Sequence, residues 1–432
     1  MIRCFWYFFF FIYCQYIQAN VSFYLETTNS GYWYAKAYNL LSNSPKKEDA
    51  LFDVYLEATS DINALTSKQL FYFLRNNELS IPTNLSHGNT LDLKVWKYIR
   101  EHALKIPETD KTTLRNAKVK LVNALQKHKS IFEKLEKFWI LDTKKINFYC
   151  FLSTTNKIKS NISGAWLANY VSKDVHALSF LCILPIQVDS FLNDYLSIIA
   201  HELSHALCDI RYGRENFENI ALHIGSKNSV IFGWYLNEIL AIVIGNGLFQ
   251  EAITGKRVDL TREEYCAKGI APALYKLTKE YIENSKSIDT LFIEKALQIF
   301  DTVLPSAYKD PRLCLYKVKV IKPDDIRNED VMKGLQNKTT ISSFEIFNLS
   351  ELKPDIIKKI KNSSDTLMVL FYDSKSIKNL TSIIPNFNYN DKNLINIINK
   401  ENKTYIFIKL RRKHSIRYHI NALFKEKTYD CI

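Results

Sequence analysis

The segment Tyr195-Leu196-Ser197-Ile198-Ile199-Ala200-His201-Glu202-Leu203-Ser204-His205 joins an apolar run to an H-E-x-x-H motif. Its apolar spacing, which continues to Ile210, predicts a buried helix over about residues 190–210. Residues four apart lie on one face of a helix, so His201 and His205 point to the same side. Two neutral imidazoles at this spacing can bind one Zn²⁺. Glu202 is the candidate general base, because it can reach a zinc-bound water and accept its proton.

A third metal ligand is expected elsewhere in the chain, because a catalytic zinc usually has three protein ligands and a water. Glu238 is the strongest candidate, since it lies in the middle of an apolar, helix-like stretch over residues 230–249. An unpaired buried carboxylate is costly, and a metal ion would supply the missing positive charge. Two other residues stay open as ligands. Asp209 comes one helical turn after His205, and His223 has no local pattern around it.

The two segments together resemble the gluzincins, zinc peptidases that combine H-E-x-x-H with a glutamate ligand on a following helix. In their aminopeptidase branch this helix reads W-L-N-E-G-x-A. The matching residues here are Trp234, Leu236, Asn237, Glu238 and Ala241, with Ile239 in place of the glycine. The resemblance implies that Glu238 is a zinc ligand beside the two histidines. It also implies that Asn237 supports the first histidine or its helix.

A weaker resemblance concerns the end of the motif helix. Asp209-Ile210-Arg211-Tyr212-Gly213 follows a D-x-x-Y-G pattern similar to the aspartate-ligand segment of deuterolysin-like peptidases. Asp209 is therefore expected as a rival ligand or as a residue that contacts a ligand. Tyr212 and Tyr235, with Tyr275 as a further option, are candidate hydrogen-bond donors to the transition state.

The order of the predicted elements indicates an α+β fold with a zincin-like catalytic core. This core consists of a small antiparallel or mixed sheet, the active-site helix and the following ligand helix. By resemblance, the strand at 175–184 is expected at the sheet edge, where it pairs with an extended substrate. The expected divisions are a signal peptide (1–19), a helical N-terminal domain (20–140), the zincin-like domain (141–310) and a small C-terminal α/β domain (311–432).

The individual elements are expected from apolar spacing. Strands are predicted at 146–152, 162–170, 175–184, 366–372 and 404–410. Helices are predicted at 32–41, 48–58, 67–75, 91–103, 113–135, 190–210, 230–249, 261–285, 291–300, 352–361 and 394–399.

The N-terminus predicts export. One positive charge, Arg3, precedes a short apolar core at 4–13, and small Ala19 marks a cleavage point. The core is too short for a spanning helix, which favours a cleaved signal peptide; the alternative is an uncleaved membrane anchor. No membrane span is expected once the signal peptide is removed. Six cysteines would remain, and an exported chain permits disulfides among them.

Composition and net charge limit the classes of binding partner that we expect. The chain has 432 residues, 47% of them hydrophobic, which is enough for a large core. Its net charge of +13 is spread along the sequence without a concentrated patch, so no specific nucleic-acid partner is expected. We therefore expect a secreted zinc endopeptidase with one catalytic Zn²⁺ and a peptide or protein substrate. The alternative is a catalytically silent, exported interaction module that only binds zinc.

Overall fold

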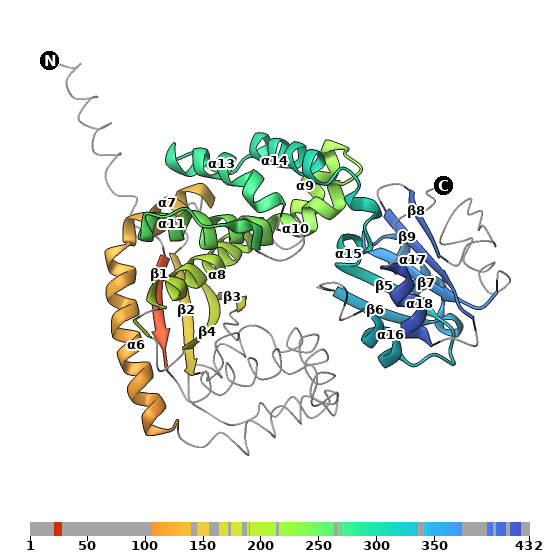
Figure 1. Cartoon of the computed structure of the whole chain (residues 1–432), viewed down its shortest axis with the longest axis horizontal. Coiled ribbons are helices and arrows are strands. Elements are labelled where there is room, and N and C mark those ends of the chain that lie inside the picture. Colours follow the sequence, from red (N-terminus) through yellow and green to blue (C-terminus); the bar gives the residue numbers. More distant parts are fainter. Residues whose placement is uncertain are drawn as a thin grey trace. The chain divides into compact units, whose positions relative to one another are not determined.

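Two sheets, each packed against helices, organise the chain in the computed structural model (Figure 1). The chain divides into a first unit, residues 1–214 and 237–289, and a second unit, residues 215–236 and 290–432. Helices and strands are mixed in both units, which confirms the α+β class at this level. The described residues are 21–27, 106–139, 145–154, 164–171, 174–183, 188–189, 191–212, 216–262, 267, 269–335, 338, 341, 343–373, 395–400, 403–411 and 415–424.

The sheet of the first unit has four described strands in the order β1-β2-β4-β3. They are β1 (Val21–Glu26), β2 (Lys145–Thr154), β3 (Gly164–Val171) and β4 (Asp174–Ile183). β1, β2 and β4 are parallel, whereas β3 is antiparallel to β4 and forms one edge. The three strands predicted between residues 146 and 184 are confirmed. β1 lies in the range predicted to be helical, and that prediction is wrong there, because parallel pairing with distant β2 determines its conformation.

Two helices of the first unit pack against the helix that carries the motif. They are α6 (Glu108–Lys127) and α7 (Lys129–Trp139), and the motif helix is α8 (Leu192–Tyr212). Both α6 and α7 contact α8, and α8 also contacts β3 and β4. The single helix predicted at 113–135 is thus two helices that meet at His128. The four helices predicted between residues 32 and 103 lie outside the described residues.

A continuous helical run follows from residue 229 to residue 254. It comprises α10 (Ser229–Ala241), the π-helix η3 (Ile242–Phe249) and α11 (Gln250–Thr254), and it ends at Gly255 with a φ of +69°. Among the described residues, only this helix is long and apolar enough to cross a membrane, and 83% of its apolar window is buried inside the protein. A buried core helix of a water-soluble protein passes the same test, so this is weak evidence for a span.

The remaining helices before the second sheet are short or of medium length. They are α9 (Asn216–Ile224), η4 (Leu260–Arg262), α13 (Ile270–Glu283), α14 (Thr290–Val303), η5 (Ala307–Lys309) and α15 (Pro311–Cys314). The helices predicted at 261–285 and 291–300 correspond to α13 and α14, although α13 begins nine residues later than expected.

The second sheet has five described strands in the order β6-β5-β7-β9-β8. Only β8 runs antiparallel to its neighbour. The strands are β5 (Lys317–Lys322), β6 (Ser343–Asn348), β7 (Thr366–Phe371), β8 (Ile395–Lys400) and β9 (Lys403–Lys409). The associated helices are α16 (Asn328–Leu335), η6 (Leu349–Glu351), α17 (Pro354–Lys361) and α18 (Ile416–Leu423).

The C-terminal elements largely follow the prediction. The strands expected at 366–372 and 404–410 and the helix expected at 352–361 are confirmed as β7, β9 and α17. The helix predicted at 394–399 is wrong, because this segment forms β8 and pairs with β9 in a register that places Ile397 opposite Ile406. The chain moves from β5 to β6 and then back past β5 to β7, so the rule of right-handed crossovers predicts α16 and α17 on opposite faces of the sheet.

Three buried cysteines of the described chain are not part of a disulfide: Cys150, Cys208 and Cys314. They lie in β2, α8 and α15, where each packs as a small apolar side chain. Any disulfide that an exported chain permits therefore does not involve these three residues.

Candidate metal centre

Helix α8 places both histidines of the motif on one face. The opposite side of the helix is apolar and buried, with Leu196, Ile199, Leu203 and Leu207 each at most 1% exposed. Burying side chains of this size contributes about 1.5–3 kcal/mol each, which fixes the rotation of α8 about its axis. The His201 and His205 rings therefore project from a rigid helix, 4.8 Å apart between centroids.

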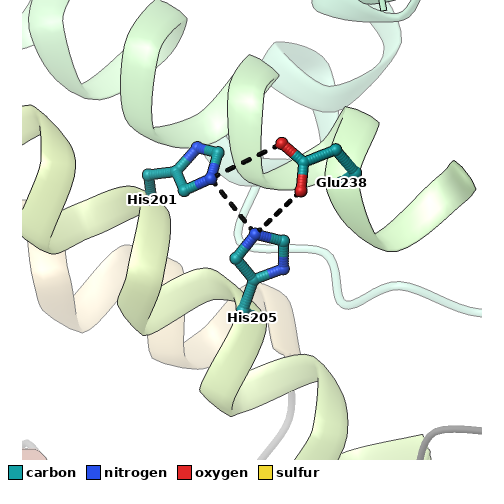
Figure 2. A group of neighbouring side chains, drawn as sticks. All are labelled: His201, His205 and Glu238. Atoms are coloured by element: carbon teal, nitrogen blue, oxygen red, sulfur yellow. Dashed lines mark hydrogen bonds and ion pairs between the residues drawn. The ribbon is translucent and has the colours of Figure 1, made fainter. Parts of the chain in front are cut away.

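Glu238 completes a three-residue group from the facing helix α10. Its carboxylate lies 3.2 Å from Nε2 of His205 and 3.7 Å from Nε2 of His201, and the two Nε2 atoms are 3.1 Å apart (Figure 2). Figure 2 shows the three side chains converging on one point from two helices. Among the described residues, only this group of histidines, cysteines and carboxylates has the spacing to hold a metal ion.

The spacing of the three donor atoms fits a tetrahedral zinc ion. Two ligand atoms that each lie roughly 2.0–2.1 Å from Zn²⁺ are about 3.3 Å apart in a tetrahedral site. The three observed separations lie on either side of this value. Two imidazoles and one carboxylate are also a common donor set of catalytic zinc, and such a set leaves the fourth position for water.

The charges of the triad are strongly coupled. Burial alone lowers the pKa of His205, but the hydrogen bond and negative charge of Glu238 outweigh it, and the pKa rises to about 9. Burial likewise raises the pKa of Glu238, while His205 and His201 act in the opposite direction and bring it down to about 2. At neutral pH a proton on His205 thus supplies the positive charge that the carboxylate requires.

A hydrogen-bonded chain fixes the ring of His205. Nδ2 of Asn237 donates to the Asp209 carboxylate at 3.5 Å, so Oδ1 of the same amide faces Nδ1 of His205, at 3.0 Å. Nδ1–H then donates to Asn237, which leaves Nε2 to bind a metal. Asn237 was predicted to support the first histidine or its helix, and its contacts are with that helix, through the second histidine and Asp209. Asp209 is outside the metal-binding group and holds Asn237.

Glu202 lies beside the triad. It follows His201 on α8, its residue is 4% exposed, and its negative charge contributes to the raised pKa of His205. A carboxylate in this buried position interacts with nearby charge more strongly than one in water.

Two residues that sequence reasoning missed hold the helices at close range. A Cβ atom at Gly245 would lie 2.6 Å from the backbone N and Cα of His201, so only glycine fits at this contact. The Ser197 hydroxyl donates to the Gly245 carbonyl at 2.8 Å. The available signal was a glycine inside an otherwise apolar helix, which is unfavourable unless close packing requires it. The π-helix η3 carries Gly245 to this position, and π-helices are frequent at functional sites.

The other sequence-predicted residues lie elsewhere. The hydroxyls of Tyr212 and Tyr235 donate to the carbonyls of Ile288 and Leu313 at 3.2 Å each. The Tyr275 hydroxyl is bonded to Glu251. His223 is exposed on α9 in the second unit and does not belong to the metal-binding group.

The predicted substrate edge is also corrected. β4, which immediately precedes α8, pairs on both sides and is therefore an interior strand. The edge strands of the described sheet are β1 and β3, and β3 is the one that follows β4 in the sheet order and contacts α8. Its antiparallel pairing with β4 leaves its outer side unpaired among the described strands.

Comparisons with known proteins give no match to a protein-family model, to a curated protein or to a solved structure.

Proposed function

We propose that the chain is a zinc-dependent peptidase of the gluzincin type. In this proposal His201, His205 and Glu238 bind one Zn²⁺. The observation that carries the proposal is the convergence of their three donor atoms within 4.8 Å of one another, on two helices, inside an H-E-x-x-H sequence. Glu202 is what distinguishes a catalytic site from a purely structural one, because zinc binding alone does not require it.

The chemistry is hydrolysis of a peptide bond. Held by His201, His205 and Glu238, a Zn²⁺ ion would supply Lewis-acid activation of water and of the scissile carbonyl. The Glu202 carboxylate would accept a proton from the attacking water and deliver it to the leaving amine. Asn237 keeps the imidazole of His205 in the tautomer that presents Nε2, and Asp209 keeps Asn237 in the required orientation.

An extended polypeptide is the substrate class that the sheet geometry favours. β3 is an edge strand that contacts the helix carrying both histidines, so its open side is available for an added strand. Main-chain hydrogen bonds to this edge would align an unfolded segment regardless of its sequence. We infer an endopeptidase for this reason, since such pairing does not require a chain terminus.

The arrangement also supports the zincin-like core that the sequence suggested. Its parts are a mostly parallel sheet with one antiparallel edge strand, a motif helix against that edge, and a ligand helix across from it.

The decisive variant is Glu202→Gln, which keeps the size of the side chain and removes the base. Chelator-sensitive cleavage of casein by the purified full chain should fall by roughly 10²–10⁴-fold. The zinc content should stay at one ion per chain. The matched control is Glu283→Gln, an exposed glutamate on α13 of the same unit, which should cleave at the wild-type rate. Wild-type cleavage by Glu202→Gln would overturn the mechanism.

Export is part of the proposal because residues 1–19 have the composition of a signal peptide. N-terminal sequencing of secreted protein should begin at Asn20. A secreted form that retains the apolar segment at 4–13 would contradict cleavage there.

A further inference from the structure

A second candidate site lies in the second unit, at one end of its sheet. Here a cavity of about 460 Å³ is lined by residues that follow three different strands. Asp325 and Ile326 follow β5, Tyr372 follows β7, and Leu410 and Arg411 follow β9. Because these strands are parallel, the cavity lies outside their carboxyl ends. Its volume falls in the range of about 300–1,000 Å³ that is typical of small-molecule sites.

The topology of the sheet favours a ligand at this place. The chain leaves β5 to form β6 on one side and later forms β7 on the other side of β5. The connections at the carboxyl ends of β5 and β7 therefore belong to opposite halves of the sheet. In open parallel sheets, ligands bind outside the carboxyl ends where the strand order reverses in this way.

Hydrogen bonds tie the walls of the cavity together. The Tyr372 hydroxyl donates to the Asp325 carboxylate at 2.9 Å, which joins the segments after β7 and β5. The Arg411 backbone N–H donates to Nε2 of His419 at 3.0 Å, which joins the end of β9 to α18. His419 is 2% exposed, so this link is buried.

The polar lining favours an anion. Three cationic side chains face two carboxylates: Lys333, Arg411 and Arg417 against Asp325 and Asp330. Three cationic and two acidic residues give the lining a positive net charge. Arg327, outside the lining, offsets the charge of Asp330 through two hydrogen bonds of 3.0 Å, and the Asp325 carboxylate accepts a hydrogen bond from Tyr372.

The first turn of α18 contributes backbone donors to the same cavity. Ser415 caps this eight-residue helix by accepting from the Tyr418 backbone N–H, and Ser415, Ile416 and Arg417 all line the cavity. The first N–H groups of a helix have no acceptor within the helix and carry partial positive charge. Such a turn beside guanidinium groups is a favourable environment for a phosphate.

We propose that this cavity binds a small phosphorylated molecule. Its phosphate would lie between the first turn of α18 and the side chains of Arg411 and Arg417. The remainder would lie against Tyr372, Ile326 and Leu410. The site is independent of the proposed metal centre, because all of its residues belong to the second unit.

Isothermal titration of the full chain tests the proposal with three probes at matched ionic strength: inorganic phosphate, pyrophosphate and adenosine 5′-monophosphate. At least one should bind saturably, whereas adenosine and chloride should not. Equal affinity for inorganic phosphate and the nucleotide would identify the phosphate alone as the ligand. Tighter binding of the nucleotide would show that the apolar wall contributes.

Arg417→Ala should raise the Kd of the probe that binds by about tenfold or more, because it removes a charge-assisted contact. Arg411→Ala should have an effect of the same kind. The control is Lys353→Ala, which removes one exposed positive charge at the start of α17, outside the cavity lining, and should leave the Kd within about twofold. Circular dichroism and zinc content should match wild type in all three variants. Lack of saturable binding by wild type, or unchanged affinity in a folded Arg417→Ala, would overturn the proposal.

Discussion

The two units contain sheets of similar design and place their polar groups differently. Each sheet is mainly parallel and has one antiparallel strand at an edge, β3 in the first unit and β8 in the second. In the first unit the candidate ligands project from two helices. In the second unit the candidate binding groups follow the carboxyl ends of strands. The order of strands in a sheet thus does not by itself determine which elements carry the candidate functional residues.

The two units also differ in how a glycine packs against a neighbouring helix. A Cβ atom at Gly245 would meet the backbone of His201, whereas one at Gly334 would lie 2.6 Å from the terminal Cδ1 of Ile420. A backbone atom of a packed helix cannot move without moving the helix. The end of an isoleucine side chain can change rotamer, and the Cβ and Cγ2 of Ile420, at 3.2 and 3.3 Å, need to move by only a few tenths of an ångström. The candidate metal centre therefore lies at a rigid contact, and the packing of α16 on α18 is adjustable.

The largest effect is expected from Gly245→Ala. The added methyl group must push η3 away from α8, and we expect a loss of about 3 kcal/mol or more in the free energy of unfolding. The separation of His201 and His205 from Glu238 should increase, so zinc affinity should fall as well. Urea unfolding and zinc competition with a chelator measure the two quantities. A variant with wild-type stability and wild-type zinc affinity would show that the contact does not position the site.

An intermediate effect is expected from the hydrogen-bonded chain behind His205. Asn237→Ala removes the acceptor of Nδ1–H and should lower zinc affinity by roughly 10–100-fold. Asp209→Asn should lower zinc affinity by a smaller factor. An asparagine side chain at 209 can donate as well as accept, so it no longer forces the Asn237 amide to direct its oxygen at His205. If Asn237→Ala binds zinc with wild-type affinity, Asn237 does not position His205 for metal binding.

The pH dependence of zinc binding follows from the charges of the triad. The pKa of His205 is raised to about 9 in the metal-free protein, so its proton stabilises the fold fully below about pH 6.5 and this contribution is lost as the pH approaches 9. Metal binding requires the neutral imidazole and must release this proton at pH 7–8. Zinc affinity should therefore rise by up to about tenfold per pH unit until about pH 9.

Chelator competition at several pH values between 6.5 and 9 measures this dependence. The low pKa of Glu238, about 2, keeps the carboxylate ionised throughout this range, so it adds no slope of its own. An affinity that does not change with pH would contradict the coupling between His205 and Glu238.

The smallest effect is expected from Gly334→Ala in the second unit. The Ile420 side chain can move, and alanine favours the helix by about 1 kcal/mol relative to glycine, so the net change should be about 1 kcal/mol or less. Phosphate and zinc binding should both stay at the wild-type level. A loss as large as that of Gly245→Ala would erase the distinction between the two contacts.

Sequence reasoning found the features that are local. The H-E-x-x-H spacing and the apolar face of α8 lie in one continuous segment, so helical geometry is enough to place His201 beside His205. Glu238 was found because a carboxylate within an apolar helix needs a partner.

The features that were missed depend on partners distant in sequence. β1 and β8 take their strand conformation from pairing with β2 and β9, and β3 is recognised as the edge only when the strand order is known. Local apolar spacing at 394–399 is compatible with a helix, and pairing decides against it. The cavity of the second unit was missed for the same reason, since its lining comes from segments after three strands.

The most direct test of the metal centre is anomalous diffraction at the zinc edge from crystals of the zinc-loaded full chain. We predict one strong peak for the unit that contains α8, about 2.0–2.2 Å from Nε2 of His201, Nε2 of His205 and a carboxylate oxygen of Glu238. A zinc ion bound at other residues, or no bound zinc at full occupancy, would contradict this prediction.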